Sequence, residues 1–285
     1  MFSNYNNGDV QAIYNLVRDK KWTFEEMYKY GAAVVEDNNG TAGDEGQYGI
    51  TSSKKEYYLS LMVASDVTIT KMAKDGTLVF TLPSDTSSRD KLEQIMKYNQ
   101  GNDIYYDTHE SIHYGAPENM FENGQALFSV KSIYFIPDVR GKMEKEFGIL
   151  PIPMYDVDQG KYIGATAGGD VACLLNTVPD SDLENIGIIM EAWAFHSQHN
   201  LVPVYQEQLI KTRYASDLDS YEMLTIIFDT AYAYGGLGNI NINPIMETII
   251  TSYFLKDGEV GLTSVLQKMN PTVKKEINNI TKGIK

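Results

Sequence analysis

The sequence contains very little cysteine. Of its 285 residues only Cys173 is a cysteine, so no disulfide can form within the chain and no cysteine-ligated zinc site can be assembled. Cys173 lies in an apolar run, Val171 to Leu175, which predicts a buried thiol that behaves as a small core hydrophobe. Disulfide-stapled folds and cysteine-based zinc folds are therefore excluded.

The sequence is also short of positive charge. It has 24 lysine and arginine residues against 38 aspartate and glutamate residues, which gives a net charge of −14. An acidic surface repels phosphate groups, and this argues against a nucleic-acid partner and against binding to an anionic membrane surface. No apolar run approaches the length of a membrane-spanning helix, and residues 1–30 lack the basic and apolar segments of a signal peptide.

What is present indicates a helix-rich α/β fold with few strands. Fractions of 43% hydrophobic and 11% aromatic residues are typical of a folded chain with a substantial core. Hydrophobic spacing and capping residues such as Asp9 and Thr23 predict helices over about residues 10–17, 23–35, 84–98, 137–147, 182–197, 202–212, 218–233, 243–256 and 258–281. Strands are expected as a hairpin within 69–82, as adjacent extended segments at 124–130 and 148–152, and at 162–175.

One motif suggests metal-dependent catalysis. His109-Glu110-Ser111-Ile112-His113 has two histidines one helical turn apart, with a glutamate that could activate a zinc-bound water. Gly115 and Pro117 end such a helix within a turn, however, and this favours two surface histidines in a polar linker. A zinc-dependent hydrolase that uses His109, Glu110 and His113 is the alternative function.

A second motif imitates the start of a calcium-binding loop. Asp37, Asn39 and Thr41 occupy the positions of the first oxygen ligands. Ala42 stands where such a loop needs glycine, and Tyr48 stands where it needs a bidentate carboxylate. The sequence therefore predicts a degenerate loop or a solvated turn, and no bound metal.

The aromatic residues point to ligand binding. The chain has 20 tyrosines, and aromatic faces stack on sugar rings while the phenol adds one directional hydrogen bond. Aromatics outside helical core spacing occur at Tyr57, Tyr58, Tyr105, Tyr106, Tyr134, Phe135, Tyr155, Tyr162 and Tyr234. For each of them a partly buried core position is the simpler interpretation. Phosphate-binding loops, nucleophile elbows and dinucleotide fingerprints are absent from the sequence, which therefore predicts no enzyme and no cofactor.

The order of several short motifs resembles that of a known family. These motifs are Leu16–Met27 (LVRDKKWTFEEM), Gln47–Gly49, Met120–Phe128 (MFENGQALF), Phe147–Pro153 (FGILPIP), Gly168–Val171 (GGDV) and Glu191–Ser197 (EAWAFHS). Together they resemble bacterial extracellular solute-binding proteins of the sugar type, family 1, which are the substrate receptors of ABC importers. The likeness spans nearly all of the chain, whereas family members run considerably longer and carry a first α/β half-lobe that is missing here.

The resemblance implies a type II periplasmic-binding-protein-like fold, present as one lobe and a return segment of the other. Residues 1–155 and 206–285 would form a region like the C-terminal lobe. Residues 156–205 would be a crossing segment that belongs to the largely absent N-terminal lobe. The resemblance also implies a lipoprotein at the cell surface whose full-length form meets ABC permease subunits.

The same resemblance implies a set of ligand-binding residues for an oligosaccharide or a related solute. Tyr134 or Phe135, after the strand 126–128, would stack on a sugar ring, and Asp170 would accept sugar hydroxyls. Tyr58 and Tyr234 are further candidates by position. The leading hypothesis is thus a truncated carbohydrate receptor; a pure interaction module follows only if no ligand binds and the uncovered apolar face mediates self-association.

Overall fold

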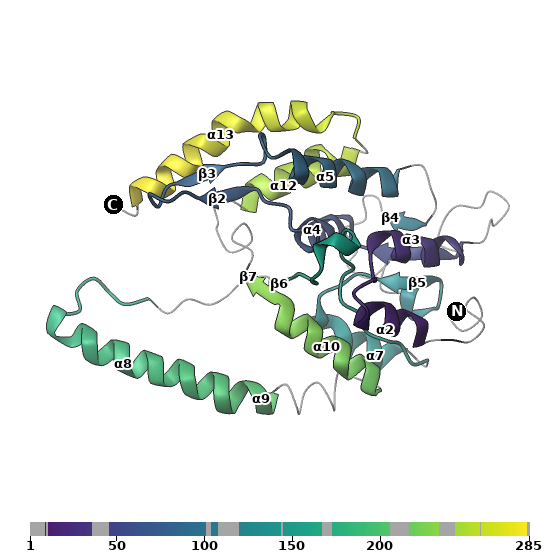
Figure 1. Ribbon diagram of the computed structural model, residues 1–285, viewed down its shortest axis with the longest axis horizontal. Coiled ribbons are helices and arrows are strands. Elements are labelled where there is room, and N and C mark those ends of the chain that lie inside the picture. The colour runs from purple at the N-terminus through teal and green to yellow at the C-terminus, as the bar shows by residue number, and fades with distance from the viewer. Residues whose placement is uncertain are drawn as a thin grey trace.

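The computed structural model describes residues 9, 11–35, 46–100, 104–107, 120–143, 145–166, 173–205, 217–233, 243–256 and 258–283. The helices of this part of the chain are α2 (Gln11–Arg18), α3 (Phe24–Ala32), α4 (Lys54–Ala64), α5 (Thr86–Asn99), α7 (Ile136–Lys142), α8 (Asp180–His196), α9 (Val202–Tyr205), α10 (Leu218–Thr230), α12 (Asn243–Ser252) and α13 (Leu262–Gly283). The strands are β1 (Tyr48–Ser52), β2 (Thr70–Met72), β3 (Leu78–Phe80), β4 (Tyr105–Asp107), β5 (Ala126–Ser129), β6 (Gly164–Thr166) and β7 (Ala231–Ala233). The predicted helix-rich α/β class is confirmed (Figure 1).

A three-stranded parallel sheet forms the centre of the fold. Its strand order is β4-β1-β5, and Ile50 of β1 lies opposite Tyr105 on one side and Phe128 on the other. Helix α3 packs against β1, because Gly31 and Gly49 let the two backbones approach closely. A Cβ atom on Gly49 would lie only 2.5 Å from the Gly31 Cα atom. Since all three strands are parallel, their carboxyl ends meet at one edge of the sheet.

The predicted helix starts depend on local side-chain caps. Asp9 accepts a hydrogen bond from the Gln11 backbone N–H at 3.0 Å, ahead of α2. Thr23 caps α3 by accepting from the N–H of Glu26, and Asp85 caps α5 by accepting from the N–H of Ser88. These caps satisfy amide groups that have no partner inside a helix. The helix predictions at all three places are confirmed.

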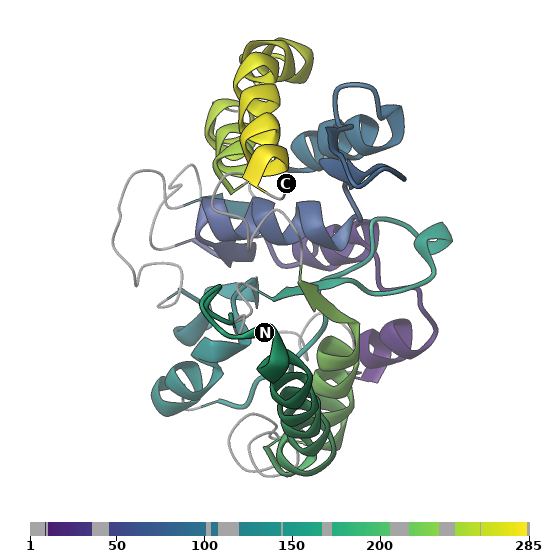
Figure 2. The ribbon, with the colours of Figure 1, turned by 90° about the vertical axis from the view of Figure 1, so that its left-hand side faces the viewer.

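Four elements build a layer on one side of helix α4 (Figures 1 and 2). The predicted hairpin is confirmed as the antiparallel pair β2–β3, and it lies with α5, α12 and α13 on one side of α4. One core joins these layers to the sheet, and its largest fully buried side chains include Trp22, Phe24, Tyr57, Tyr58 and Phe254.

The proline-rich segment 148–153 contains no helix, as the sequence predicts. It does not pair with β5, whose described partner is β1. Instead Met154 bridges to Thr23, and the Trp22 indole donates a hydrogen bond to the Pro151 carbonyl at 3.0 Å. The segment is thus held by the α2–α3 connection and not by the sheet.

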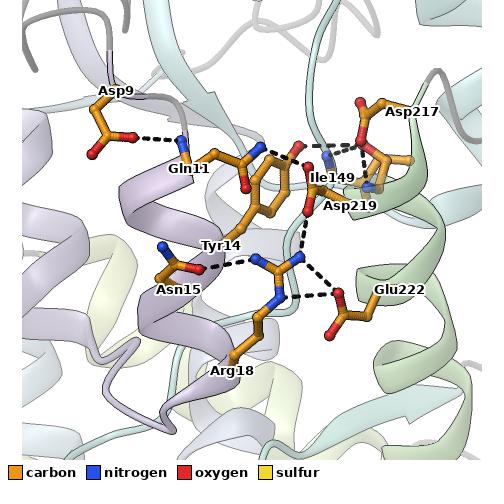
Figure 3. A network of polar contacts seen from close by, with 10 residues as sticks. Asp9, Gln11, Tyr14, Asn15, Arg18, Ile149, Asp217, Asp219 and Glu222 are labelled. Atoms are coloured by element: carbon orange, nitrogen blue, oxygen red, sulfur yellow. Dashed lines mark hydrogen bonds and ion pairs between the residues drawn. The ribbon is translucent and has the colours of Figure 1, made fainter.

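A polar network fastens α10 to α2, across about 200 positions of sequence (Figure 3). The Arg18 guanidinium contacts the carboxylates of Asp219 and Glu222, with Glu222 Oε2 at 2.7 Å from Nη2 and 3.0 Å from Nε. Gln11 donates to Asp219 at 2.7 Å, and this hydrogen bond, with the contact to Arg18, holds the pKa of Asp219 below its usual value. The network thus holds α10, which follows α8 and α9 in the chain, beside α2.

Several predicted elements are shorter in the structure. The predicted strand 162–175 is described as strand only in β6, and residues 167–172 lie outside the described residues. The predicted helix 218–233 ends at Thr230, because the chain then turns into β7, which pairs in parallel with β6. The charged helix predicted at 137–147 ends at Lys142.

The prediction that Cys173 is buried is wrong. Cys173 is exposed, and its neighbours Leu174 and Leu175 are 48% and 76% exposed. An apolar run is buried only if another part of the fold covers it, and Cys173 to Leu175 remain exposed in the structure.

Helix α8 stands apart from the rest of the molecule (Figure 1). No residue of α8 is buried, although its sequence is rich in large apolar side chains. The exposed ones on α8 and the two segments after it are Leu183, Ile188, Ile189, Trp193, Phe195, Leu201, Val202 and Val204. Within the described residues, no helix is both long enough and apolar enough to cross a membrane.

Candidate functional site

The carboxyl edge of the parallel sheet is the natural place for a ligand. In open α/β sheets, ligands bind outside the carboxyl ends of the strands, where the connecting loops diverge. Here β1 ends at Ser52 and β5 at Ser129. The Ser52 hydroxyl donates to the Val130 carbonyl at 2.7 Å, and the Tyr105 hydroxyl donates to the Ser52 carbonyl at 3.2 Å. These two bonds hold the ends of the strands in a fixed position.

Tyr134 lies at this edge with its ring open to solvent. It sits in a 3₁₀ turn, Ile133–Phe135, which follows β5 and is capped by Ser132, whose hydroxyl accepts from the Tyr134 N–H at 3.4 Å. The side chain of Tyr134 is 76% exposed. Its ring meets the partly buried ring of Phe135 edge to face, with centroids 5.6 Å apart. The Phe135 ring therefore contacts the Tyr134 ring edge to face, and a face of the Tyr134 ring is available for stacking.

Lys131 is a further residue of this region, and the sequence interpretation did not consider it. It comes two positions after the end of β5, and its Nζ atom lies 5.4 Å from the Phe135 ring centroid, close enough for a cation–π contact. The pKa of Lys131 is lowered to about 8, mainly by partial burial and also by the nearby charge of Lys142, while Glu56 and Asp138 act in the opposite direction. A charged residue inside the apolar run Ala126–Ile136 was the signal in the sequence.

Tyr58 lies in the core. It is part of α4, only 2% exposed, and its ring stacks on Phe254 with centroids 4.3 Å apart. A ligand at the surface cannot reach a ring that the core covers on both sides. The simpler interpretation of the tyrosine pairs, core packing, also holds for Tyr57, which is fully buried and stacks on Tyr105 at 4.1 Å.

The other predicted site residues cannot be compared with these. Asp170 and Tyr234 lie outside the described residues, and so do the zinc motif, His109 to His113, and the loop that starts at Asp37. In the part of the chain that the structure describes, no group of three or more histidine, cysteine, aspartate or glutamate side chains is arranged to hold a metal ion.

The fold of the chain is similar to solved structures, although comparisons of its sequence find no match. No protein-family model matches it, and a comparison with curated proteins gives no match. The maltose/maltodextrin-binding domain MalE from Bdellovibrio bacteriovorus, bound to maltotriose, is similar with a TM-score of 0.54 at 15% identity. A cyclo/maltodextrin-binding protein complexed with maltotetraose is similar with a TM-score of 0.54 at 13% identity.

These similarities cover nearly all of this chain but only about two-thirds of each relative. Each match spans 90% of this chain, and it spans 67% of the first relative and 64% of the second. At such low identity the likeness concerns the fold. The chain has the helix-rich α/β fold of periplasmic-type binding proteins over about two-thirds of their length, as the sequence resemblance predicts.

Proposed function

We propose that the chain is part of an oligosaccharide receptor of an ABC importer, and that Tyr134 is its main sugar-stacking residue. The observation that carries the proposal is the likeness in fold to two proteins whose structures hold maltotriose and maltotetraose. The exposed ring of Tyr134, at the edge of the sheet where ligands bind in such folds, supports it. The role is binding without catalysis, and the full-length form would work at the cell surface with permease subunits.

We further propose that part of the chain belongs to a second lobe. A helix that is apolar on every side is normally buried in a larger core, and α8 has no buried residue. Tyr162 and Ile163, by contrast, are buried in the main core, 6% and 4% exposed. We therefore propose that the crossing segment begins after Thr166. The first lobe would then consist of residues 1–166 and 206–285.

The proposal predicts weak binding by this chain alone. A saccharide cleft in such receptors has two walls, and one wall is largely missing under the proposal. Stacking of a ring on one aromatic contributes about 1–3 kcal/mol, whereas micromolar binding needs about 8 kcal/mol. Affinities in the millimolar range are therefore expected, and saturation-transfer NMR suits that range.

The test compares the parent chain with Tyr134→Ala, using maltotriose and a panel of other oligosaccharides. The substitution should abolish the saturation-transfer signal. Met72→Ala is a matched control, because Met72 is also well exposed, at 64%, but lies on the β2–β3 hairpin. That control should bind like the parent chain.

Two results would count against the proposal. Binding that survives Tyr134→Ala would place the pocket elsewhere. One tightly held zinc ion per chain, measured by elemental analysis, would favour the hydrolase alternative that uses His109, Glu110 and His113.

A further inference from the structure

The helical segment that begins with α8 has two apolar faces of different width. Helix α8 continues through a π-helical turn, Ser197–Leu201, into α9, and residues 180–205 together span about 39 Å at 1.5 Å per residue (Figure 1). Helical spacing divides the large apolar side chains between two opposite sides. The wide face consists of Leu183, Ile186, Ile189, Met190, Trp193 and Leu201, and the narrow face of Ile188, Phe195 and Val202. None of these side chains is buried.

The wide face is large enough for a protein interface. Four of its six side chains are 42–70% exposed, and the other two are half-buried. The face presents roughly 650 Å² of apolar surface, and a stable interface takes about 600–1,000 Å² from each partner. Trp193, the most exposed of the six, lies at the middle of the face, where the residues that dominate binding are usually found. A contiguous exposed patch of this kind marks an interaction site.

The charges of this segment are distributed unevenly along its length. Residues 180–191 contain four carboxylates, whereas residues 192–205 contain none and carry His196 and His199. The segment has no lysine or arginine, so it does not fit an anionic membrane surface, which selects helices with basic polar faces. Two such segments side by side in parallel would bring their carboxylates together, and like charges at an interface repel. An antiparallel pair places the acidic half of each beside the other's histidines and opposes the two helix dipoles favourably.

We infer that α8 mediates a homodimer in which the wide faces of two copies pack antiparallel, with the two Trp193 side chains at the two-fold axis. An interface of this symmetry uses the same patch on both copies, so the patch must complement itself. The wide face does so, because a second copy brings an apolar stripe of equal length and a charge pattern that matches when reversed. The dimer does not depend on the receptor function proposed above. The second lobe proposed there is the competing occupant of this face.

The experiment measures the mass of the intact chain by sedimentation over a concentration series. The parent chain should form dimers with a dissociation constant below about 100 μM. Two neighbouring isoleucines give a matched pair, because Ile189 on the wide face is 66% exposed and Ile188 on the narrow face is 62% exposed. Ile189→Gln should weaken the dimer at least about 10-fold, since it places an amide in an apolar contact. Ile188→Gln should dimerise like the parent chain.

Two further measurements report on the geometry without a change to the wide face. Trp22 is buried, so the tryptophan emission of the parent chain should shift to longer wavelength on dilution, as Trp193 returns to water. A chain that carries Cys173→Ser and Ser181→Cys has one cysteine for a spin label, in the first turn of α8. Labels in an antiparallel dimer should lie about 35 Å apart, whereas a parallel pair would hold them about 10 Å apart.

Three results would overturn the inference. A chain that stays monomeric at about 100 μM has no such dimer; binding of that monomer to phosphatidylcholine vesicles would make lipid the occupant, and no binding would leave the second lobe. Equal weakening by Ile189→Gln and Ile188→Gln would exclude the wide face as the contact. A short distance between the labels would exclude the antiparallel pair. Each of these results leaves the sugar-binding test of Tyr134 unaffected.

Discussion

Two long helices of this protein, α13 and α8, differ in what they bury. Helix α13 presents one apolar stripe, Leu262, Val265, Leu266, Met269, Val273 and Ile277, and all of these residues are buried against β3 and α12. Helix α8 carries apolar residues on every side and buries none of them. This difference shows that a helix with one apolar stripe can bury that stripe within this chain. A helix that is apolar on every side needs packing partners on more than one side.

The largest effect expected from this comparison concerns matched leucines. Leu266→Ala in α13 removes a side chain that is 3% exposed, so it should lower the free energy of unfolding by about 2–5 kcal/mol. Leu183→Ala in α8 removes one that is 42% exposed and should change it by less than about 0.5 kcal/mol. Urea unfolding measures both. Equal losses would mean that α8 is packed in solution.

The second effect is loss of stability in alkali, and it concerns the packed region alone. Burial raises the pKa of Tyr162 and of Tyr253 to about 12, above the unfolded value of about 10. The stability that comes from keeping these phenols neutral is complete below pH 10 and is lost as the pH rises toward 12. The urea midpoint should fall over that interval, together with a rise in tyrosinate absorbance. A chain that carries both Tyr162→Phe and Tyr253→Phe should show a smaller fall. Helix α8 contains no tyrosine and should contribute nothing to the fall.

A third effect compares how the helices begin. Asp217 caps α10 by accepting from the Ser220 N–H at 2.7 Å and from its hydroxyl at 3.0 Å, whereas α8 begins after Pro179 with no side-chain cap. Asp217→Ala should therefore cost about 1 kcal/mol. Asp180→Ala, in the first turn of α8, should cost only a few tenths through the helix dipole. A larger cost for Asp180→Ala, by thermal melting, would contradict the comparison.

The smallest effect on stability should come with the clearest effect on surface behaviour. Trp193→Gln replaces a side chain that is 70% exposed on α8, so the free energy of unfolding should change by less than about 0.5 kcal/mol. Exposed apolar patches bind hydrophobic dyes and other apolar surfaces, and the variant should bind less dye and scatter less light at high concentration. A marked loss of stability would show that Trp193 has a partner within the chain.

The predictions that Asp9 and Thr23 begin helices were confirmed. Their side chains satisfy nearby amides, and that requires only residues two or three positions away. The hairpin expected within 69–82 was confirmed as β2–β3, and Gly76 in its turn has a φ of 80°, a conformation that glycine adopts without strain. Tyr134 was named through the family resemblance; its exposure of 76% is a finding of the structure, and its role in binding stays a prediction.

The errors and omissions concern contacts between distant segments. Strand β1 and helix α4 were missed, because β1 is buried on all sides and so shows no alternation. Lys131 was overlooked because its contact with the Phe135 ring and its nearness to the charges of Glu56 and Lys142 arise only in the folded chain. Cys173 was placed in the core on the strength of an apolar run, but burial needs a covering surface that a run of sequence does not contain.

The sequence by itself determined the class of fold, the helix caps, the hairpin and the order of motifs that resembles a family of solute receptors. Each of these depends on spacing along the chain, which hydrophobic periodicity and hydrogen-bonding side chains record directly. Only the tertiary structure decided that Tyr57 and Tyr58 are core while Tyr134 is exposed, that Arg18 joins α2 to α10, and that Lys131 lies against the Phe135 ring. Burial and charge compensation are properties of segments brought together in space, and the position of a residue in the chain does not record them.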